Sequence, residues 1–178
     1  MKRRKTMKKS NKILLWVIAI ITLCTIPFIY MAIVKRKKVA VQTPNFGSDQ
    51  TRGIKNNNPL NLRQTNIDWK HESGKDFDSA FEEFDSMVWG LRAGLRNMRT
   101  WFERGNQTIE KIISVWAPES ENDTESYIQY VSEKSGIPRD AVIEWEKDTF
   151  YPIVAAMCKI ESQFDCDYEL YKDAWNKI

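Results

Sequence analysis

Histidine is almost absent from this sequence, and its few cysteines are poorly placed for chemistry. His71 is the only histidine among 178 residues, so neither a serine–histidine catalytic system nor a histidine-based zinc site can be built. Cys24 lies in an apolar run near the N-terminus. Cys158 and Cys166 would lie about 12 Å apart on one helix, too far for a disulfide unless the chain turns, so we expect unpaired thiols. We therefore expect no metal and no cofactor, and carboxylates remain as the groups that could carry chemistry.

Acidic residues are missing from residues 1–38, which hold eleven of the 27 Lys and Arg residues. The rest of the chain holds sixteen basic residues and all 24 acidic ones, a net charge near −8. A nucleic-acid-binding domain needs a basic face on its folded part. Because the excess of basic charge is confined to the N-terminal segment, we expect no nucleic-acid partner.

Residues 13–34 form an uncharged run of 22 residues, which spans roughly 33 Å as a helix and is long enough to cross a bilayer. A cleaved signal peptide is the alternative, but the run is too long for one, and basic residues 35–38 stand where small cleavage-site residues belong. Heavier positive charge before the run favours a single-pass protein with its N-terminus inside and its C-terminal domain outside. The predicted parts are a basic tail (1–12), a transmembrane helix (13–34), a basic flank and linker (35–50) and one folded domain (51–178).

The folded domain is predicted to be mainly α, in the α+β class, with a small β-wing. Short stretches separated by turn formers in residues 62–84 favour two or three strands. Beyond them, apolar residues recur at steps of three and four, with capping residues and breakers between the runs. This pattern predicts helices over residues 86–104, 108–116, 124–135, 138–145, 152–164 and 165–178, with Pro138 and Pro152 opening the fourth and fifth.

Glu161 is the most informative single residue of the domain. It lies four residues after Met157 and eight after Ile153, on or beside the apolar stripe of its predicted helix. A desolvated carboxyl there would have a raised pKa, which a proton-donating acid needs. The alternative is a border residue that reaches solvent or pairs with an arginine, and periodicity alone favours that interpretation.

Three short segments resemble parts of lysozyme-like enzymes. Residues 160–164, Ile-Glu-Ser-Gln-Phe, resemble the Glu-Ser-x-Phe signature of lytic transglycosylases, in which the Glu protonates the glycosidic oxygen. Residues 53–55 and 58–62 resemble the loop after the catalytic helix, where Asn-Pro-Gly-Asn-Leu is usual. Residues 122–128 are similar to the Glu-Thr-x-x-Tyr-Val segment, whose Tyr lines the cleft near the acid. The acid helix stands last here and first in the family, so the resemblance implies a circularly permuted lysozyme-like domain.

A second resemblance covers residues 52–164. The string Arg-Gly-Ile-x-Asn-Asn-Asn-Pro and the later Trp-Ala-Pro at residues 116–118 are similar to a phage and prophage family, usually described as virion structural proteins of membrane-containing tailless phages. In that family the late helix often reads Glu-Asn-Gly, where this chain has Glu-Ser-Gln at residues 161–163. This departure favours the transglycosylase pattern at that position.

Together the resemblances imply a membrane-anchored, phage-type enzyme that degrades peptidoglycan. Glu161 would act as general acid and then as base on the β-1,4 bond between N-acetylmuramic acid and N-acetylglucosamine. Residues expected to orient sugar and acid, or to stack on a pyranose ring, are Ser162, Asn58, Asn61, Tyr127, Trp116 and Trp69; core packing is the alternative role for the two tryptophans. A lytic transglycosylase needs one Glu, whereas a lysozyme would need a second carboxylate, for which Asp68, Glu72, Asp76 and Asp78 are the candidates.

The alternative function is a catalytically inactive vertex or membrane protein of the virion that keeps a lysozyme-like scaffold. The expected partners are peptidoglycan glycan strands, a lipid bilayer through residues 13–34, and other virion proteins. The expected location is the internal membrane of a phage virion or the inner membrane of the host.

Overall fold

The computed structural model describes residues 50–74 and 77–178. The predicted transmembrane helix, residues 13–34, lies outside this part of the chain. Within the described residues, no helix combines the length and the apolar character needed to cross a membrane.

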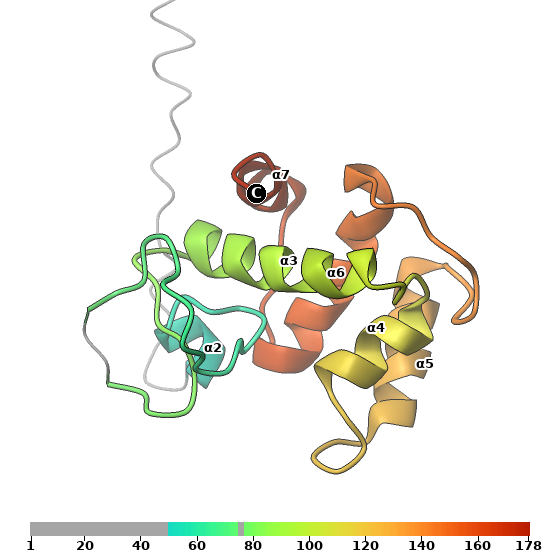
Figure 1. The fold of residues 1–178 in the computed structure, drawn as a ribbon, viewed down its shortest axis with the longest axis horizontal. Coiled ribbons are helices and arrows are strands. Elements are labelled where there is room, and N and C mark those ends of the chain that lie inside the picture. Colours follow the sequence, from blue (N-terminus) through green and yellow to red (C-terminus); the bar gives the residue numbers. More distant parts are fainter. Residues whose placement is uncertain (1–49, 75–76) are drawn as a thin grey trace, which may run out of the picture. The chain divides into compact units, whose positions relative to one another are not determined.

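The described part of the chain is mainly α-helical, as predicted (Figure 1). Helix α3 runs across the domain, with α2 and the loops that follow it near one of its ends and α4 and α5 near the other. Helix α6 packs against α5, and α7 packs against α3. The six helices in these residues are α2 (Arg52–Lys55), α3 (Met87–Glu103), α4 (Ile109–Trp116), α5 (Thr124–Ser135), α6 (Lys147–Ser162) and α7 (Tyr168–Trp175).

Local signals explain why several helices begin and end where the sequence predicts. The side chains of Thr108, Asp123 and Asp167 each accept a hydrogen bond from a backbone N–H in the first turn of α4, α5 and α7. Gly136 ends α5 in the left-handed conformation, with φ of 71°. The predictions for α3, α4 and α5 are therefore confirmed to within one or two residues.

The predicted helix over residues 138–145 is wrong. The backbone of this segment pairs with the connection between α3 and α4: the Ile143 amide donates to the Gln107 carbonyl at 2.9 Å, and the Glu110 amide donates to the Arg139 carbonyl at 3.0 Å. Ile143 is buried while Val142 is 76% exposed, as in an extended segment. These tertiary hydrogen bonds replace the helical ones that the Pro138 signal suggested.

Pro152 does not open α6, contrary to prediction. The helix begins at Lys147, so Pro152 lies inside it, past the first turn. The added turn brings Phe150 into the core, where it is completely buried and contacts the rings of Phe102, Trp145 and Trp175. Burial of the Phe150 ring stabilises the first turn of α6. The preference of proline for the start of a helix does not predict this turn.

The predicted β-wing is reduced to two isolated antiparallel bridges, Arg63 with Phe81 and Glu72 with Phe84. Side chains hold these loops instead. Asp78 accepts hydrogen bonds from the guanidinium of Arg52, at 2.5 and 2.8 Å, and from the Asn56 amide at 2.7 Å. The Arg52 guanidinium lowers the pKa of Asp78 to about 2, with further help from Asn56. The wing is therefore an irregular polar loop region rather than a small sheet.

Glycines allow the loop after α2 to pack closely against two helices. A Cβ atom on Gly90 of α3 would lie 1.9 Å from the Asn57 carbonyl oxygen. A Cβ atom on Gly53 of α2 would lie 2.6 Å from the Cβ of Ser162, in the last turn of α6. Both distances are shorter than any normal contact, so a side chain larger than hydrogen would force the packed segments apart. This packing places residues 58–62 against the C-terminal end of α6.

Candidate active site

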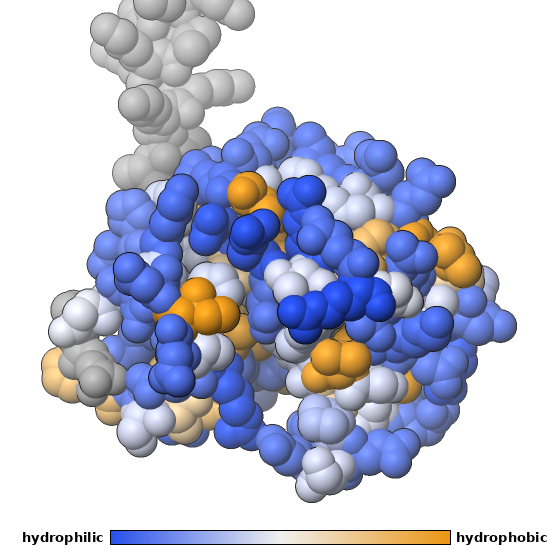
Figure 2. All heavy atoms as spheres, viewed as in Figure 1, coloured by the Kyte–Doolittle hydropathy of each residue, from blue (hydrophilic) through white to orange (hydrophobic). Residues whose placement is uncertain are grey.

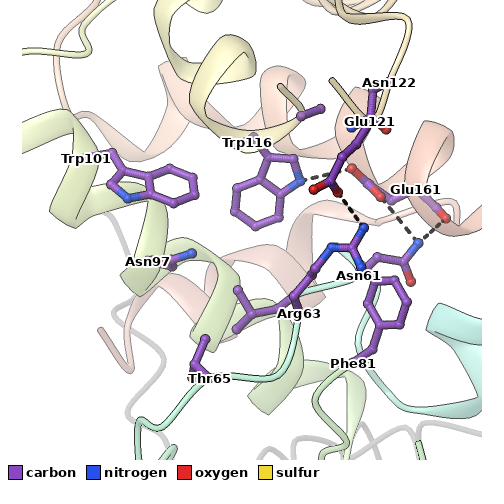
Figure 3. A pocket seen from close by; sticks show the side chains of 12 residues that line it. Asn61, Arg63, Thr65, Phe81, Asn97, Trp101, Trp116, Glu121, Asn122 and Glu161 are labelled. Carbon is purple, nitrogen blue, oxygen red and sulfur yellow. Dashed lines mark hydrogen bonds and ion pairs between the residues drawn. The ribbon is translucent and has the colours of Figure 1, made fainter. Parts of the chain in front are cut away.

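A pocket of about 310 Å³ opens beside the C-terminal end of α6. One wall is formed by the loop after α2, the back by α3, and the opposite wall by the end of α4 and the turn that follows it (Figure 3). The surface is indented at the lower edge of Figure 2, between these loops. Its polar and aromatic lining residues include Asn61, Arg63, Asn97, Trp101, Trp116, Glu121 and Glu161.

Glu161 is half-buried in this pocket, and three side chains hold its carboxyl group. The Tyr127 hydroxyl and the Trp116 indole N–H both donate to Oε1, each at 2.9 Å. The Asn61 amide donates to the Glu161 backbone carbonyl at 2.5 Å and approaches Oε2 at 3.3 Å. The donors come from the loop after α2, from α4 and from α5, so distant parts of the sequence meet at one carboxyl group.

Burial raises the pKa of Glu161 above its ordinary value, although the hydrogen bonds from Tyr127, Trp116 and Asn61 and the charge of Arg63 act in the opposite direction. The pKa of Tyr127 is well above its usual range because of burial and the neighbouring carboxylate, so its hydroxyl stays protonated and donates. An indole N–H can only donate. Oε1 therefore accepts two hydrogen bonds, whereas Oε2 accepts only the longer one from Asn61 and is the oxygen better placed to hold a proton.

Asn61 is fixed in an unusual way that orients its amide toward Glu161. Its backbone has φ of 47°, in the left-handed region that asparagine tolerates. Its Oδ1 is buried and has no hydrogen-bond partner among the described residues. An unpaired buried acceptor costs free energy, and in a native structure it calls for an explanation such as a functional role. The Asn61 amide nitrogen, in contrast, is bonded to Glu161.

Of the predicted substrate-binding residues, Asn61 and Trp116 line the pocket, whereas Tyr127, Ser162, Asn58 and Trp69 do not. Ser162 is buried, and its hydroxyl bonds to the carbonyls of Pro59 and Cys158. Asn58 is completely buried, and all its side-chain hydrogen bonds go to the backbone of Leu62 and Glu82.

Trp69 belongs to a small cluster with Leu62, Phe84 and Ala93. Its indole N–H bonds to Thr65 and Glu82. Ser162, Asn58 and Trp69 therefore support the loop that carries Asn61. Packing and buried hydrogen bonds account for these residue types.

Thr51, the residue before α2, also contacts the end of α6. Its hydroxyl donates to the Ser162 carbonyl at 2.5 Å. Beyond Ser162, Gln163 ends the helix with φ of 56°, and the Phe164 amide donates to the Cys158 carbonyl. The turn that carries Glu161 is thus held by its own helix cap and by the segment that opens the folded domain.

None of the predicted second carboxylates that the structure describes lines the pocket. Asp78 is paired with Arg52, Asp68 and Glu72 lie outside the lining, and Asp76 is outside the described residues. The pocket instead contains Glu121, a carboxylate that no motif of the sequence singles out. Its place two residues before Asp123, the cap of α5, is the one signal that could have pointed to it.

Asn97 and Trp101 are further lining residues that sequence reasoning missed. They are four residues apart on α3 and so share a face of the helix. The Trp101 ring meets the Trp116 ring edge to face, with centroids 5.6 Å apart. An amide beside two aromatic rings suits a ligand with both hydroxyl groups and apolar faces.

Cys158 and Cys166 are both free and buried. They do not lie on one helix, because α6 ends at Ser162 between them, and their side chains interact. Within residues 50–74 and 77–178, no three His, Cys, Asp or Glu side chains are grouped so that they could hold a metal ion.

No protein-family model matches this sequence. The chain is similar to Protein P5 of Pseudoalteromonas phage PM2, with 43% identity over 119 residues. The alignment covers 65% of this chain and 73% of that protein. It is too long to be confined to the first 49 residues, so it includes much of the folded domain.

Proposed function

The chain belongs to the same family as Protein P5 of Pseudoalteromonas phage PM2, and from this premise we propose that it is a virion-associated phage protein that cleaves bacterial peptidoglycan. The proposed substrate is the glycan strand, and the proposed reaction is cleavage of the β-1,4 bond between N-acetylmuramic acid and N-acetylglucosamine. The observation that carries this proposal is the half-buried Glu161 carboxyl, with one oxygen fixed by two donors and a raised pKa, in the wall of an open pocket.

The first step of the proposed mechanism uses the proton on Glu161 Oε2. The acid gives this proton to the glycosidic oxygen, the bond to the muramic acid C1 breaks, and the shortened strand leaves with a free hydroxyl. The Tyr127 and Trp116 donors then stabilise the carboxylate that has formed on Glu161. Removal of either donor would destabilise the Glu161 carboxylate and so slow this step.

The second step needs no second carboxylate from the protein. The resemblance to lytic transglycosylases implies that the acetamido group of the substrate supports C1. Glu161 then takes the proton of the muramic acid 6-hydroxyl, and that oxygen closes on C1 to give a 1,6-anhydro ring. The pocket supports this single-acid route, because its only other lining carboxylate among the described residues, Glu121, is bound to Arg63.

The pocket also offers the contacts that a sugar requires. The Trp101 and Trp116 rings provide apolar faces for a pyranose ring, and the amides of Asn61 and Asn97 provide hydrogen-bonding groups. We place the glycan along the indentation between the loop after α2 and the turn after α4 (Figure 2).

We further propose that residues 13–34 anchor the protein in a bilayer, with the basic tail 1–12 inside and the domain 51–178 outside. A basic flank and linker, residues 35–50, would let the domain reach the cell wall. The proposed location is the virion internal membrane or the inner membrane of the host.

The test is cleavage of purified peptidoglycan by the full-length protein in detergent, with the products analysed by mass spectrometry. Wild-type protein should release 1,6-anhydro muropeptides, and Glu161→Gln should lower the rate by about 10²-fold to 10⁴-fold. Glu133→Gln, an exposed carboxylate on α5 outside the pocket, is the matched control and should retain full activity. Equal rates of muropeptide release by Glu161→Gln and wild type would refute the mechanism. A wild-type protein that releases no muropeptides would favour the alternative, a catalytically inactive virion protein.

A further inference from the structure

An ion pair joins the two walls of the pocket beside Glu161. Arg63, on the loop after α2, contacts Glu121 at 2.7 Å between Nη2 and Oε2, although the two residues are 58 positions apart (Figure 3). Glu121 lies in a turn closed by its own amide, which donates to the Pro118 carbonyl at 2.9 Å. Both side chains line the same pocket as Glu161. The pair therefore links the two walls of the pocket.

The electrostatic surroundings of Glu161 are simple. The titratable groups that face it are Tyr127 on α5, Cys158 on α6, Arg63 on the loop after α2, and Glu121 on the turn after α4. Burial raises the pKa values of the Tyr127 hydroxyl and the Cys158 thiol, so both groups are neutral near pH 7. Of these four described neighbours, Arg63 and Glu121 are the ones that form an ion pair.

Arg63 alone would be an unfavourable neighbour for an acid that must hold its proton. A nearby cation favours the ionised form of a carboxyl group, and the charge of Arg63 does lower the pKa of Glu161. The guanidinium also lies over the Phe81 ring, 5.2 Å from the centroid, and Phe81 forms a backbone bridge with Arg63. These contacts help to hold the cation at the pocket.

We propose that Glu121 is a positioning residue that cancels most of the positive charge of Arg63 at Glu161 and holds the guanidinium toward the opposite wall. A paired charge produces a weaker field at a distance than a single charge does. The significance of this role for catalysis rests on the proposed function, whereas the charge compensation itself does not. Glu121 is thus assigned to control of the acid rather than to attack on the sugar.

The test measures the pKa of Glu161 directly, by NMR of the full-length protein with ¹³C-labelled glutamate carboxyl groups. The Glu161 signal is assigned as the one that disappears in Glu161→Gln. Glu121→Gln should lower the pKa by about 0.5, because Arg63 is then unpaired, and Arg63→Gln should raise it by a similar amount. The double variant should return to within about 0.2 of wild type, and all shifts should shrink in about 0.5 M salt.

The control is a second exposed ion pair of the same kind. Arg99→Gln and Glu103→Gln remove the pair on α3 that is 2.8 Å long and lies outside the pocket lining. These variants should leave the Glu161 titration unchanged. All four charged residues are substantially exposed, so a comparison of Tm values should show intact folding.

Two outcomes would overturn the inference: unchanged Glu161 titration in both pocket variants, or shifts of the same sign in both. If the pKa values move in opposite directions as stated, the inference holds even if no variant, including wild type, cleaves peptidoglycan. That last result would remove the proposed function alone, because NMR titration does not require turnover. In an active enzyme, the pH at which the rate falls should move with the measured pKa.

Discussion

Replacement of Gly53 by alanine tests whether the contact between α2 and α6 builds the site. A Cβ atom at this position would lie 2.6 Å from the Ser162 Cβ, and 2.8 Å from both the Asn58 carbonyl oxygen and the Asn61 Oδ1. Normal carbon–carbon contacts are about 3.5–4.0 Å, so the two elements would have to separate by about 1 Å. Such overpacking costs about 1–3 kcal/mol, and the better helix propensity of alanine offsets at most about 1 kcal/mol of it.

The expected net loss for Gly53→Ala is therefore about 1–2 kcal/mol of unfolding free energy, or a fall in Tm of roughly 3–10 °C. The separation should also pull Asn61 away from Glu161, so peptidoglycan cleavage should fall more than stability does. Urea unfolding and thermal unfolding measure the first effect, and release of muropeptides measures the second.

Gly74→Ala is the matched control, because nothing lies within 4 Å of a Cβ atom at that position. It should change the unfolding free energy by less than about 0.5 kcal/mol. Equal stabilities of the two alanine variants would refute the close-packing argument.

Two further predictions concern buried polar groups. Asn58→Ala removes three hydrogen bonds to the backbone of Leu62 and Glu82 and should cost at least about 2 kcal/mol in urea unfolding; a loss below about 0.5 kcal/mol would contradict the role given to Asn58. Glu161→Gln should gain in Tm relative to wild type as the pH rises above 4.5. The raised pKa means that the folded state keeps its proton to higher pH than the unfolded chain, so ionisation of Glu161 destabilises the fold above the ordinary value of 4.5. A Tm difference that is constant with pH would disprove this linkage.

The sequence was sufficient to predict the helices whose apolar spacing and capping residues lie within the helix or next to it. The apolar spacing of α3 and the caps Thr108 and Asp123 lie within the elements they define, so periodicity located these helices. The segment 138–145 failed because its backbone partners, residues 107–110, are about 30 positions away. A helix-opening proline carries no information about such distant partners.

The site divides in the same way. A short motif singled out Glu161, and other motifs singled out Asn61 and Tyr127, which the structure brings to its carboxyl group. Asn58 belongs to the same motif as Asn61, but burial gives it a structural role that the sequence pattern alone does not distinguish. The pairing of Arg63 with Glu121 was invisible, because exposed charged residues of both signs are common along the chain.

The hydrogen bond from Thr51 to the Ser162 carbonyl has a mechanical consequence. Thr51 is the point where the described chain enters its first helix, and Ser162 adjoins the acid. Tension applied to the protein through its N-terminal segment would reach this bond through Thr51. A force on the N-terminal segment would therefore act close to the turn that carries Glu161, and a force-clamp measurement on wild type and Thr51→Ala would test whether this bond transmits it.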